Sequence, residues 1–364
     1  MLKEKILSQL EILSPKAPPL IGVDISSSAI KLVELSPAGR DGYRLERYVI
    51  EPIAKETVTE GNIANLEAAG ESLRRAWRRM GTNIKRVAMA LPASAVITKK
   101  VIIPAAPRED DLEVQVESEA NQYLPFALDE VNLDFQVMGQ APTGPEEVEV
   151  LIAASRKEKV EDRVAVAQSA GLKPVVMDVE SYAAQAAIEL VENQLPGKSQ
   201  ERIIASVDIG ATVMRIAMFK DGQSLYVREQ QIGGNQLTQE IARHFNIDPD
   251  EAEKEKRSGS LPDGYTQEVL QPFMENVSLE IARALQFFFT STQYNKVDHI
   301  LLGGGCAMLP GLEDIVANRT QVNTLVANPF SGMQVASRVS QRLLVQDATA
   351  LLVACGLALR RFDK

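Results

Sequence analysis

Cysteine and histidine are scarce in this chain of 364 residues, which contains two of each. Cys306 and Cys355 lie in glycine-rich or apolar segments, a usage that indicates a reducing compartment and not a disulfide-linked scaffold. His244 and His299 form no spaced cluster with the cysteines, so a transition-metal site is not expected. We therefore expect a cytoplasmic protein.

The chain also has fewer basic than acidic residues, and it has no long apolar run. The chain has 39 Lys and Arg residues against 49 Asp and Glu, a formal net charge of -10, which disfavours binding to nucleic acid or to acidic membranes. The apolar run over 348–359 is shorter than the roughly 20 residues that span a bilayer. Charged residues such as Lys3 and Glu4 interrupt the first apolar stretch. We expect neither a secretory signal nor a direct transmembrane segment.

Two common phosphate-binding motifs are missing: the chain has neither Gly-x-x-x-x-Gly-Lys-Ser/Thr nor Gly-x-Gly-x-x-Gly. In their place stand two short segments, 21–32 and 205–216, each with an apolar strand, an aspartate and a turn of small residues. A basic residue, Lys31 or Arg215, stands seven positions after each aspartate. One segment opens each half of the chain, which suggests a duplicated domain that closes on a nucleotide from both sides.

The residue types in these turns suit phosphate and Mg²⁺. Backbone N–H groups reach phosphate oxygens where small residues such as Ser26, Ser27 and Gly210 let the chain bend and approach closely. Asp24 and Asp208 are candidates to hold Mg²⁺ through its water, since a cation must separate carboxylates from phosphates. Either aspartate alone is more simply a turn residue. Their pairing with a late glycine triplet, Gly303, Gly304 and Gly305, favours the nucleotide site.

The pattern of elements divides the chain into several parts. Residues 1–19 are expected to form an amphipathic helix, as a docking or frayed terminus, followed by a linker. Residues 20–103 and 175–200 are expected to form a first lobe, with a small inserted domain over 104–174. Residues 201–364 are expected to form a second lobe, with a helical subdomain over 235–298. The insertion is expected to hold helices at 109–123 and 157–170 and strands at 131–137 and 148–154. In the long helix predicted over 268–293, Phe287, Phe288 and Phe289 are expected to point inward.

These signatures, in this order, resemble the actin-like ATPase superfamily. The resemblance implies an α/β fold of two ribonuclease-H-like lobes, with a small α+β domain inserted in the first, and ATP with Mg²⁺ as cofactors. Glu180 resembles the acid at the start of the family's connecting helix, which aligns the attacking water. The implied nucleotide contacts are Asp24, Ser26, Ser27, Ser28, Lys31, Asp208, Gly210, Ala211, Thr212, Gly233, Gly234, Glu253, Lys256, Gly303, Gly304, Gly305 and Cys306.

A closer resemblance covers nearly the whole chain. Residues 22–35 and 117–126, the latter continuing through 129–131 to 134–135, are similar to the type IV pilus assembly protein PilM family, and the insertion lies where the cell-division actin homologue FtsA carries one. The resemblance implies a cytoplasmic ATP-binding scaffold, peripheral at the inner membrane. It would hold the N-terminal cytoplasmic tail of PilN between the first lobe and the insertion, with other inner-membrane and motor components as further partners.

Tyr123, Pro125 and Phe126 are expected to line or support that groove, or else to close the core of the small domain. Three departures from the superfamily pattern, Ser26 for glycine, Ser181 for proline and Cys306 for a small hydroxyl residue, favour weak or no ATP hydrolysis. A filament-forming ATPase and a small-molecule phosphotransferase remain alternatives. The sequence offers no identifiable catalytic base of the sugar-kinase type.

Overall fold

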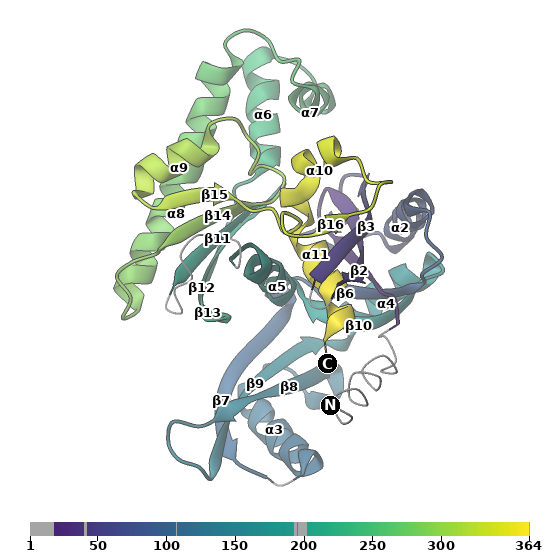
Figure 1. Ribbon diagram of the computed structural model, residues 1–364, viewed down its shortest axis with the longest axis vertical. Helices are drawn as coiled ribbons and strands as arrows, with labels where there is room; N and C mark the ends of the chain where they lie inside the picture. Colours follow the sequence, from purple (N-terminus) through teal and green to yellow (C-terminus); the bar gives the residue numbers. More distant parts are fainter. Residues whose placement is uncertain (1–17, 40–41, 107, 193–194, 196–201, 364) are drawn as a thin grey trace, which may run out of the picture.

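The computed structural model describes residues 18–363 except 40–41, 107, 193–194 and 196–201. The amphipathic helix predicted over 1–13 lies outside the described residues. Two lobes form the body of the molecule, and a smaller domain extends from them (Figure 1).

The first lobe is built on a six-stranded sheet with the strand order β10-β6-β1-β2-β3-β16. The strands are β1 (Ile21–Ile25), β2 (Ala29–Ala38), β3 (Gly42–Pro52), β6 (Arg86–Leu91), β10 (Lys173–Val179) and β16 (Gln334–Val335). The first three pair antiparallel, whereas β6 pairs parallel with β1 and β10 parallel with β6. Helices α2 (Leu66–Met80) and α4 (Lys157–Ser169) pack together beside this sheet and share a core with it.

Capping residues set the ends of helices in both lobes. The side chain of Asn65 accepts a hydrogen bond from the backbone N–H of Ala68 and so begins α2, and Gly81, at φ 64°, ends it. The residues that precede Asn65 form a short hairpin of β4 (Val58–Thr59) and β5 (Asn62–Ile63). In the second lobe, Asp248 begins α7 (Pro249–Ser258) in the same way.

The second lobe repeats the plan of the first. Its five-stranded sheet has the order β13-β12-β11-β14-β15, with β11 (Ile203–Ile209), β12 (Met214–Lys220), β13 (Gln223–Gln230), β14 (His299–Gly303) and β15 (Asn323–Val326). Again the first three strands pair antiparallel and the next pairs parallel with the first. The remaining helices of this lobe are α6 (Gly234–Phe245), α8 (Gln271–Ser291) and α9 (Leu312–Thr320). The predicted duplication is confirmed.

The inserted domain is a three-stranded sheet covered by one helix. β9 (Glu147–Arg156) lies between β7 (Val96–Pro104) and β8 (Val131–Gln140), and α3 (Glu109–Tyr123) packs on one face. Residues 96–103, which were expected to belong to the first lobe, are thus part of this sheet. The helix predicted over 157–170 in the insertion is α4, which packs on α2 in the first lobe. Periodicity predicts that a helix or strand forms, but not what it packs against. We refer to residues 96–156 as the inserted domain.

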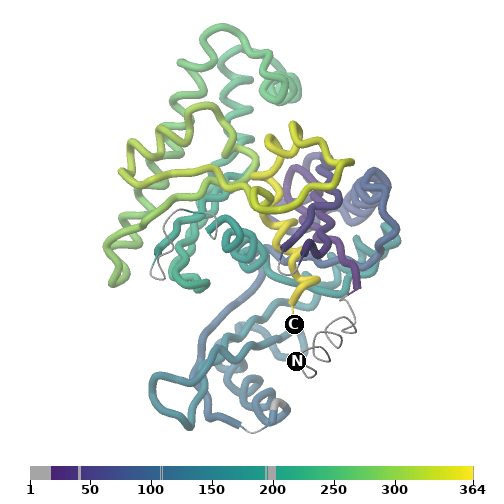
Figure 2. The backbone as a smooth tube through the Cα atoms, viewed as in Figure 1, coloured from purple at the N-terminus to yellow at the C-terminus, as the bar shows by residue number. Residues whose placement is uncertain are grey.

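Two helices connect the lobes. α5 (Glu180–Glu192) packs against α11 (Leu352–Leu359), and a Cβ at Gly356 would overlap the carbonyl oxygen of Ala183. Figure 2 shows this C-terminal segment, in yellow, beside the purple strands of the first lobe.

The helical segment that contains the apolar run 348–359 is longer than that run. α10 (Gln341–Asp347), a 3-10 turn and α11 follow one another without a break, so that Gln341–Phe362 forms 22 helical residues with the length and composition of a membrane span. Within the fold, 67% of its apolar window is buried, and it packs between the two lobes. We therefore assign this segment to the core.

The three phenylalanines of α8 do not all point inward. Phe288 is fully buried, whereas Phe287 is 53% exposed and lies beneath the guanidinium group of Arg228, 4.3 Å from the ring centre. Successive helical residues point about 100° apart, so three in a row cannot share one buried face. The prediction for Phe287 was wrong for this reason.

Candidate functional site

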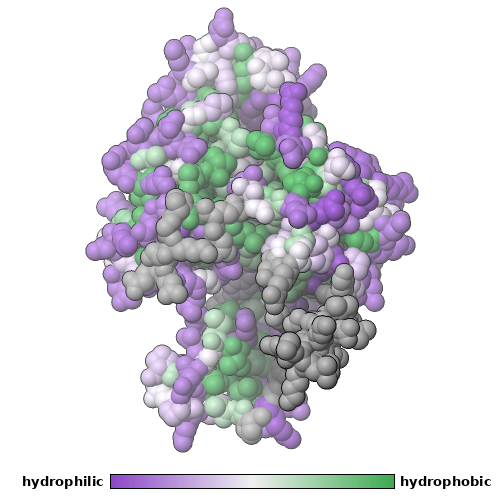
Figure 3. All heavy atoms as spheres, in the orientation of Figure 1, coloured by the Kyte–Doolittle hydropathy of each residue, from purple (hydrophilic) through white to green (hydrophobic). Residues whose placement is uncertain are grey.

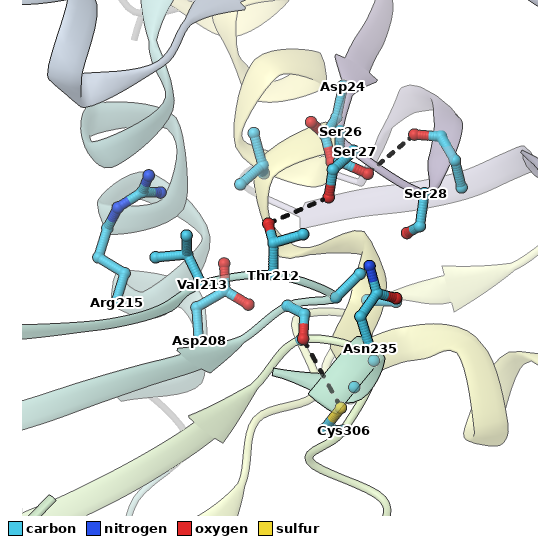
Figure 4. A pocket seen from close by; sticks show the side chains of 18 of the residues that line it. Asp24, Ser26, Ser27, Ser28, Asp208, Thr212, Val213, Arg215, Asn235 and Cys306 are labelled. Atoms are coloured by element: carbon cyan, nitrogen blue, oxygen red, sulfur yellow. Dashed lines mark hydrogen bonds between the residues drawn. The ribbon is translucent and has the colours of Figure 1, made fainter. Parts of the chain in front are cut away.

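A cleft of about 960 Å³ lies between the two lobes. Both aspartate turns, the start of α5, the beginning of α6, one face of α7 and the turn after β14 line it (Figure 4). The predicted residues that line it are Asp24, Ser26, Ser27, Ser28, Lys31, Glu180, Asp208, Gly210, Ala211, Thr212, Gly234, Glu253, Lys256, Gly304, Gly305 and Cys306. Gly233 and Gly303 stand next to this lining and do not belong to it.

The two turns have the same hydrogen-bonded form and meet across the cleft. The backbone N–H of Ser26 donates to the carbonyl oxygen of Ala29 at 3.0 Å, and that of Gly210 donates to Val213 at 3.0 Å. Ser27 Oγ lies 3.4 Å from Thr212 Oγ1 of the other lobe, as Figure 4 shows. Ser26 does not have a positive φ, so its backbone conformation does not require glycine.

Opposite charges line the floor of the cleft. Asp24 is buried, and its Oδ2 accepts a hydrogen bond from Lys31 Nζ at 2.9 Å. Burial alone would lower the pKa of Lys31, but the charge and hydrogen bond of Asp24, together with Asp208 and Glu180, raise it. Burial raises the pKa of Asp208, and Asp24 adds to the effect, against the opposing charges of Arg215 and Lys31.

Arg215 is a cleft residue that the sequence analysis did not assign to the site. Its guanidinium group donates from Nε to Glu229 Oε1 at 2.8 Å and from Nη2 to Glu180 Oε2 at 3.3 Å. The signal was present, because Arg215 follows Asp208 at the same interval at which Lys31 follows Asp24. Burial raises the pKa of Glu180, and the charge of Arg215 is the largest opposing influence.

The α6–α7 side of the cleft holds a compact polar network. Lys256 Nζ donates to the Gly234 carbonyl oxygen at 2.9 Å and lies 2.5 Å from Glu253 Oε2. Burial alone would raise the pKa of Glu253, but hydrogen bonds from Lys256 and Thr238 lower it. Cys306 donates from Sγ to the Gly210 carbonyl oxygen at 3.7 Å, and burial raises the pKa of its thiol to about 11. Cys306 is therefore a neutral thiol in the wall of the cleft.

Glycines let the loops pack closely around Asp208. Gly304 has a φ of +83°, and a Cβ there would overlap Asp208 Oδ1 and the Ile209 carbonyl oxygen. A Cβ at Gly233 would lie 2.6 Å from the Gly210 carbonyl oxygen. Gly305, in contrast, faces open space, with no atom within 4 Å of its Cβ position. Gly304 and Gly233 thus let their two loops pack against the Asp208 turn, and Gly305 leaves open space beside it.

This lining fits a nucleotide with Mg²⁺. Small-residue turns from both lobes present backbone N–H groups, and Asp24 and Asp208 supply carboxylates from opposite lobes. Within the described residues, no group of three or more His, Cys, Asp or Glu side chains could hold a metal ion. A cation in this cleft would therefore keep much of its water, as Mg²⁺ does beside phosphates.

A second cleft, of about 930 Å³, lies between the inserted domain, α5 and β13. Leu151 and Ala153 line it from the middle strand of the inserted sheet, and Tyr182 lines it from α5. Figure 3 shows the molecule narrowing between the inserted domain and the two lobes.

The predicted groove residues Tyr123, Pro125 and Phe126 do not line this second cleft. α3 packs on the sheet face that carries Val150 and Ile152, which alternate with the cleft residues along β9. Tyr123 is the last residue of α3, and Pro125 and Phe126 follow the helix. Lys99 Nζ lies 3.2 Å from the centre of the Tyr123 ring, and the Arg156 guanidinium carbon lies 5.4 Å from that of Phe126.

Known proteins resemble the chain over nearly its whole length. The family model described as type IV pilus assembly protein PilM matches residues 22–362. A structure of the PilM-PilN type IV pilus biogenesis complex is similar at 29% identity and a TM-score of 0.79, over 96% of this chain and 100% of that chain.

More distant structures share the fold. The ethanolamine utilization protein EutJ from Carboxydothermus hydrogenoformans has 18% identity and a TM-score of 0.53, over 95% of this chain and 90% of its own. MreB5 of Spiroplasma citri bound to ADP has 15% identity and a TM-score of 0.50, over 94% and 95%. These likenesses confirm the actin-like ATPase fold predicted from the sequence.

Proposed function

Because this chain belongs to the family of the type IV pilus assembly protein PilM, with a role in pilus assembly, we propose that it is an ATP-binding scaffold that holds the cytoplasmic tail of PilN. The proposal rests chiefly on the position of α5. Its first residue, Glu180, lines the interlobe cleft, while Ser181, Tyr182 and Gln185 of the same helix line the second cleft. One helix therefore borders both the cleft proposed for the nucleotide and the cleft proposed for the peptide.

Mg-ATP is the ligand proposed for the interlobe cleft. The turn N–H groups and Lys31 would hold its phosphates, and Asp24 and Asp208 would hold its Mg²⁺ through water. Because the two turns come from different lobes, bound nucleotide favours the closed arrangement in which Ser27 and Thr212 meet. We expect slow or no turnover, so that the nucleotide acts mainly as a structural ligand.

The second cleft is the site proposed for the PilN tail. Within the part of the chain that the structure describes, β8 pairs with β9 alone and β13 with β12 alone, so each has one edge without a strand partner there. Residues of both strands line the cleft. An extended peptide can add to such an edge by main-chain hydrogen bonds, with side-chain pockets for specificity. Because the tail belongs to a membrane protein, its binding in this cleft would hold the cytoplasmic scaffold at the inner membrane as a peripheral protein.

Calorimetric titration with a synthetic peptide of the PilN cytoplasmic tail, with and without Mg-ATP, tests the proposal. Ala153→Arg places a long cation in the second cleft and should abolish peptide binding. Val137→Arg is the matched control, because Val137 is exposed on β8 and does not line the cleft. Tyr123→Ala tests the site predicted from the sequence. Wild-type protein that binds no peptide in either condition would contradict the scaffold role.

A further inference from the structure

The two lobes use their equivalent cations differently. Asp24 is directly opposite Lys31 in the β1–β2 pair, and Asp208 is directly opposite Arg215 in the β11–β12 pair. Lys31 binds its own aspartate at 2.9 Å. Arg215 instead forms its ion pairs with Glu180 and Glu229. The cation of the second lobe thus reaches away from its strand partner to the first residue of α5.

The guanidinium group suits this bridging position. Glu229 of β13 is directly opposite Arg215 in the sheet, and its Oε1 accepts a hydrogen bond from Arg215 Nε at 2.8 Å. Arg215 Nη2 then donates to Glu180 Oε2 at 3.3 Å. A planar fork can hold two carboxylates with separate nitrogens, whereas an ammonium group is a single point charge. The side chains of Arg215 and Glu180 are only 17% and 15% exposed, so solvent screens the pair weakly. Glu229 therefore anchors the arginine, and the arginine holds Glu180.

Only one oxygen of Glu180 is used in this contact. Arg215 binds Oε2, and among the contacts of the described residues Oε1 takes part in no hydrogen bond. Because Glu180 lines the interlobe cleft, Oε1 is left to accept a hydrogen bond from water there.

The other charges around Glu180 make Arg215 the decisive neighbour. They are Asp24 of β1, Lys31 of β2, Asp208 of β11 and Arg163 of α4. Both aspartates and burial favour the neutral acid. Arg163 donates to the carbonyl oxygens of Ala90 and Gly61, so its hydrogen bonds are directed to backbone. Among the described residues Arg215 is the cation in ion-pair contact with Glu180.

We infer that Arg215 is a positioning residue of the nucleotide cleft, which holds the Glu180 carboxylate through Oε2 and leaves Oε1 to orient a water. The inference rests on the proposed ATP site and adds to it a residue that sets the orientation and protonation of the acid. Its contribution is made before any nucleotide binds, since all of the contacts lie within the chain.

Infrared titration of the full chain without nucleotide tests the inference. The protonated-carboxyl band of Glu180 is assigned by its loss in Glu180→Gln. In Arg215→Gln the midpoint of this band should rise by about one pH unit or more, a tenfold change in the protonation constant. In Arg215→Lys it should rise by less, because the charge stays and the fork is lost. An unchanged midpoint in either variant overturns the inference, and Arg215→Lys decides alone if Arg215→Gln does not fold.

Two further measurements separate this inference from the proposed function. Binding of a fluorescent ATP analogue to the wild type tests the nucleotide site, and its absence would remove the proposed function while the infrared result still stands. Where turnover is measurable, Arg215→Gln should shift the acid limb of its pH profile upward without a comparable loss of ATP affinity. A uniform fall in turnover with an unmoved acid limb would show that Arg215 acts on the phosphates directly, and would overturn the inference.

Discussion

Among the residues of the glycine triplet 303–305, Gly304 is the one at which substitution by alanine should disrupt the interlobe cleft most. The residue has a φ of +83°, and a left-handed conformation costs a non-glycine residue roughly 1–2 kcal/mol. The new methyl group would also overlap the Asp208 carboxylate and the Ile209 carbonyl oxygen, and relief of such overpacking costs about 1–3 kcal/mol. The sum is about 2–5 kcal/mol, which appears as lost stability or as a displaced Asp208.

Gly305→Ala is the matched control, because its Cβ would face open space and its φ is not in the positive region. Denaturant unfolding and titration with a fluorescent ATP analogue should be measured for both variants. Gly304→Ala should lower the free energy of unfolding by at least about 2 kcal/mol or weaken ATP binding at least about tenfold, and Gly305→Ala should change the free energy of unfolding by less than about 0.5 kcal/mol. Equal effects in the two variants would refute the packing argument.

Three other perturbations test separate parts of the structure. Asp24→Ala and Asp208→Ala should each weaken Mg-ATP binding at least about tenfold in calorimetry, and an unchanged affinity would show that the turn in question is not a phosphate loop. Gly356→Val should lower the free energy of unfolding by about 1–3 kcal/mol or more in denaturant, because its side chain would enter the backbone of α5; an unaltered value would contradict that contact. Burial alone would raise the pKa of Glu51, but its pairs with two arginines of α2 lower it. Its stabilising effect is therefore present above the ordinary carboxyl pKa and lost as the pH falls through the folded-state value, so the stability difference between wild type and Glu51→Gln should narrow below about pH 4. A difference that does not change with pH would be inconsistent with this pairing.

Much of the fold could be predicted because its signals are local. The two turns begin with aspartates and small residues whose hydrogen bonds close within a few positions, as those of Ser26 and Gly210 do. The helix predicted over 109–123 is α3 in the structure, with the same ends. Most of the residues named for the nucleotide site line one cleft, since the resemblance assigned each of them to a short, specific motif.

What could not be predicted depends on partners that are distant in the sequence. Residues 96–103 were expected in the first lobe but lie in β7, which pairs with β9 of the inserted domain. Residues 157–170 were expected in the insertion, but α4 packs on α2 of the first lobe. Periodicity reports which face of an element is buried but not what covers it. Likewise, no local rule indicates that the second cleft lies on the sheet face opposite α3.

The sequence by itself determined the duplicated strand–turn–strand units, the ends of α3 and the residue types of the proposed phosphate and Mg²⁺ site, because hydrogen bonds and conformational preferences over a few residues specify them. Tertiary structure alone decided that Arg215 forms an ion pair with Glu180 and not with Asp208, its partner across the strands. It also decided that Phe287 is exposed beneath Arg228, and that a helical segment long enough to span a membrane lies in the core. Each of these depends on which surfaces are brought together when the lobes pack, and a pairing between distant segments is set by the whole fold.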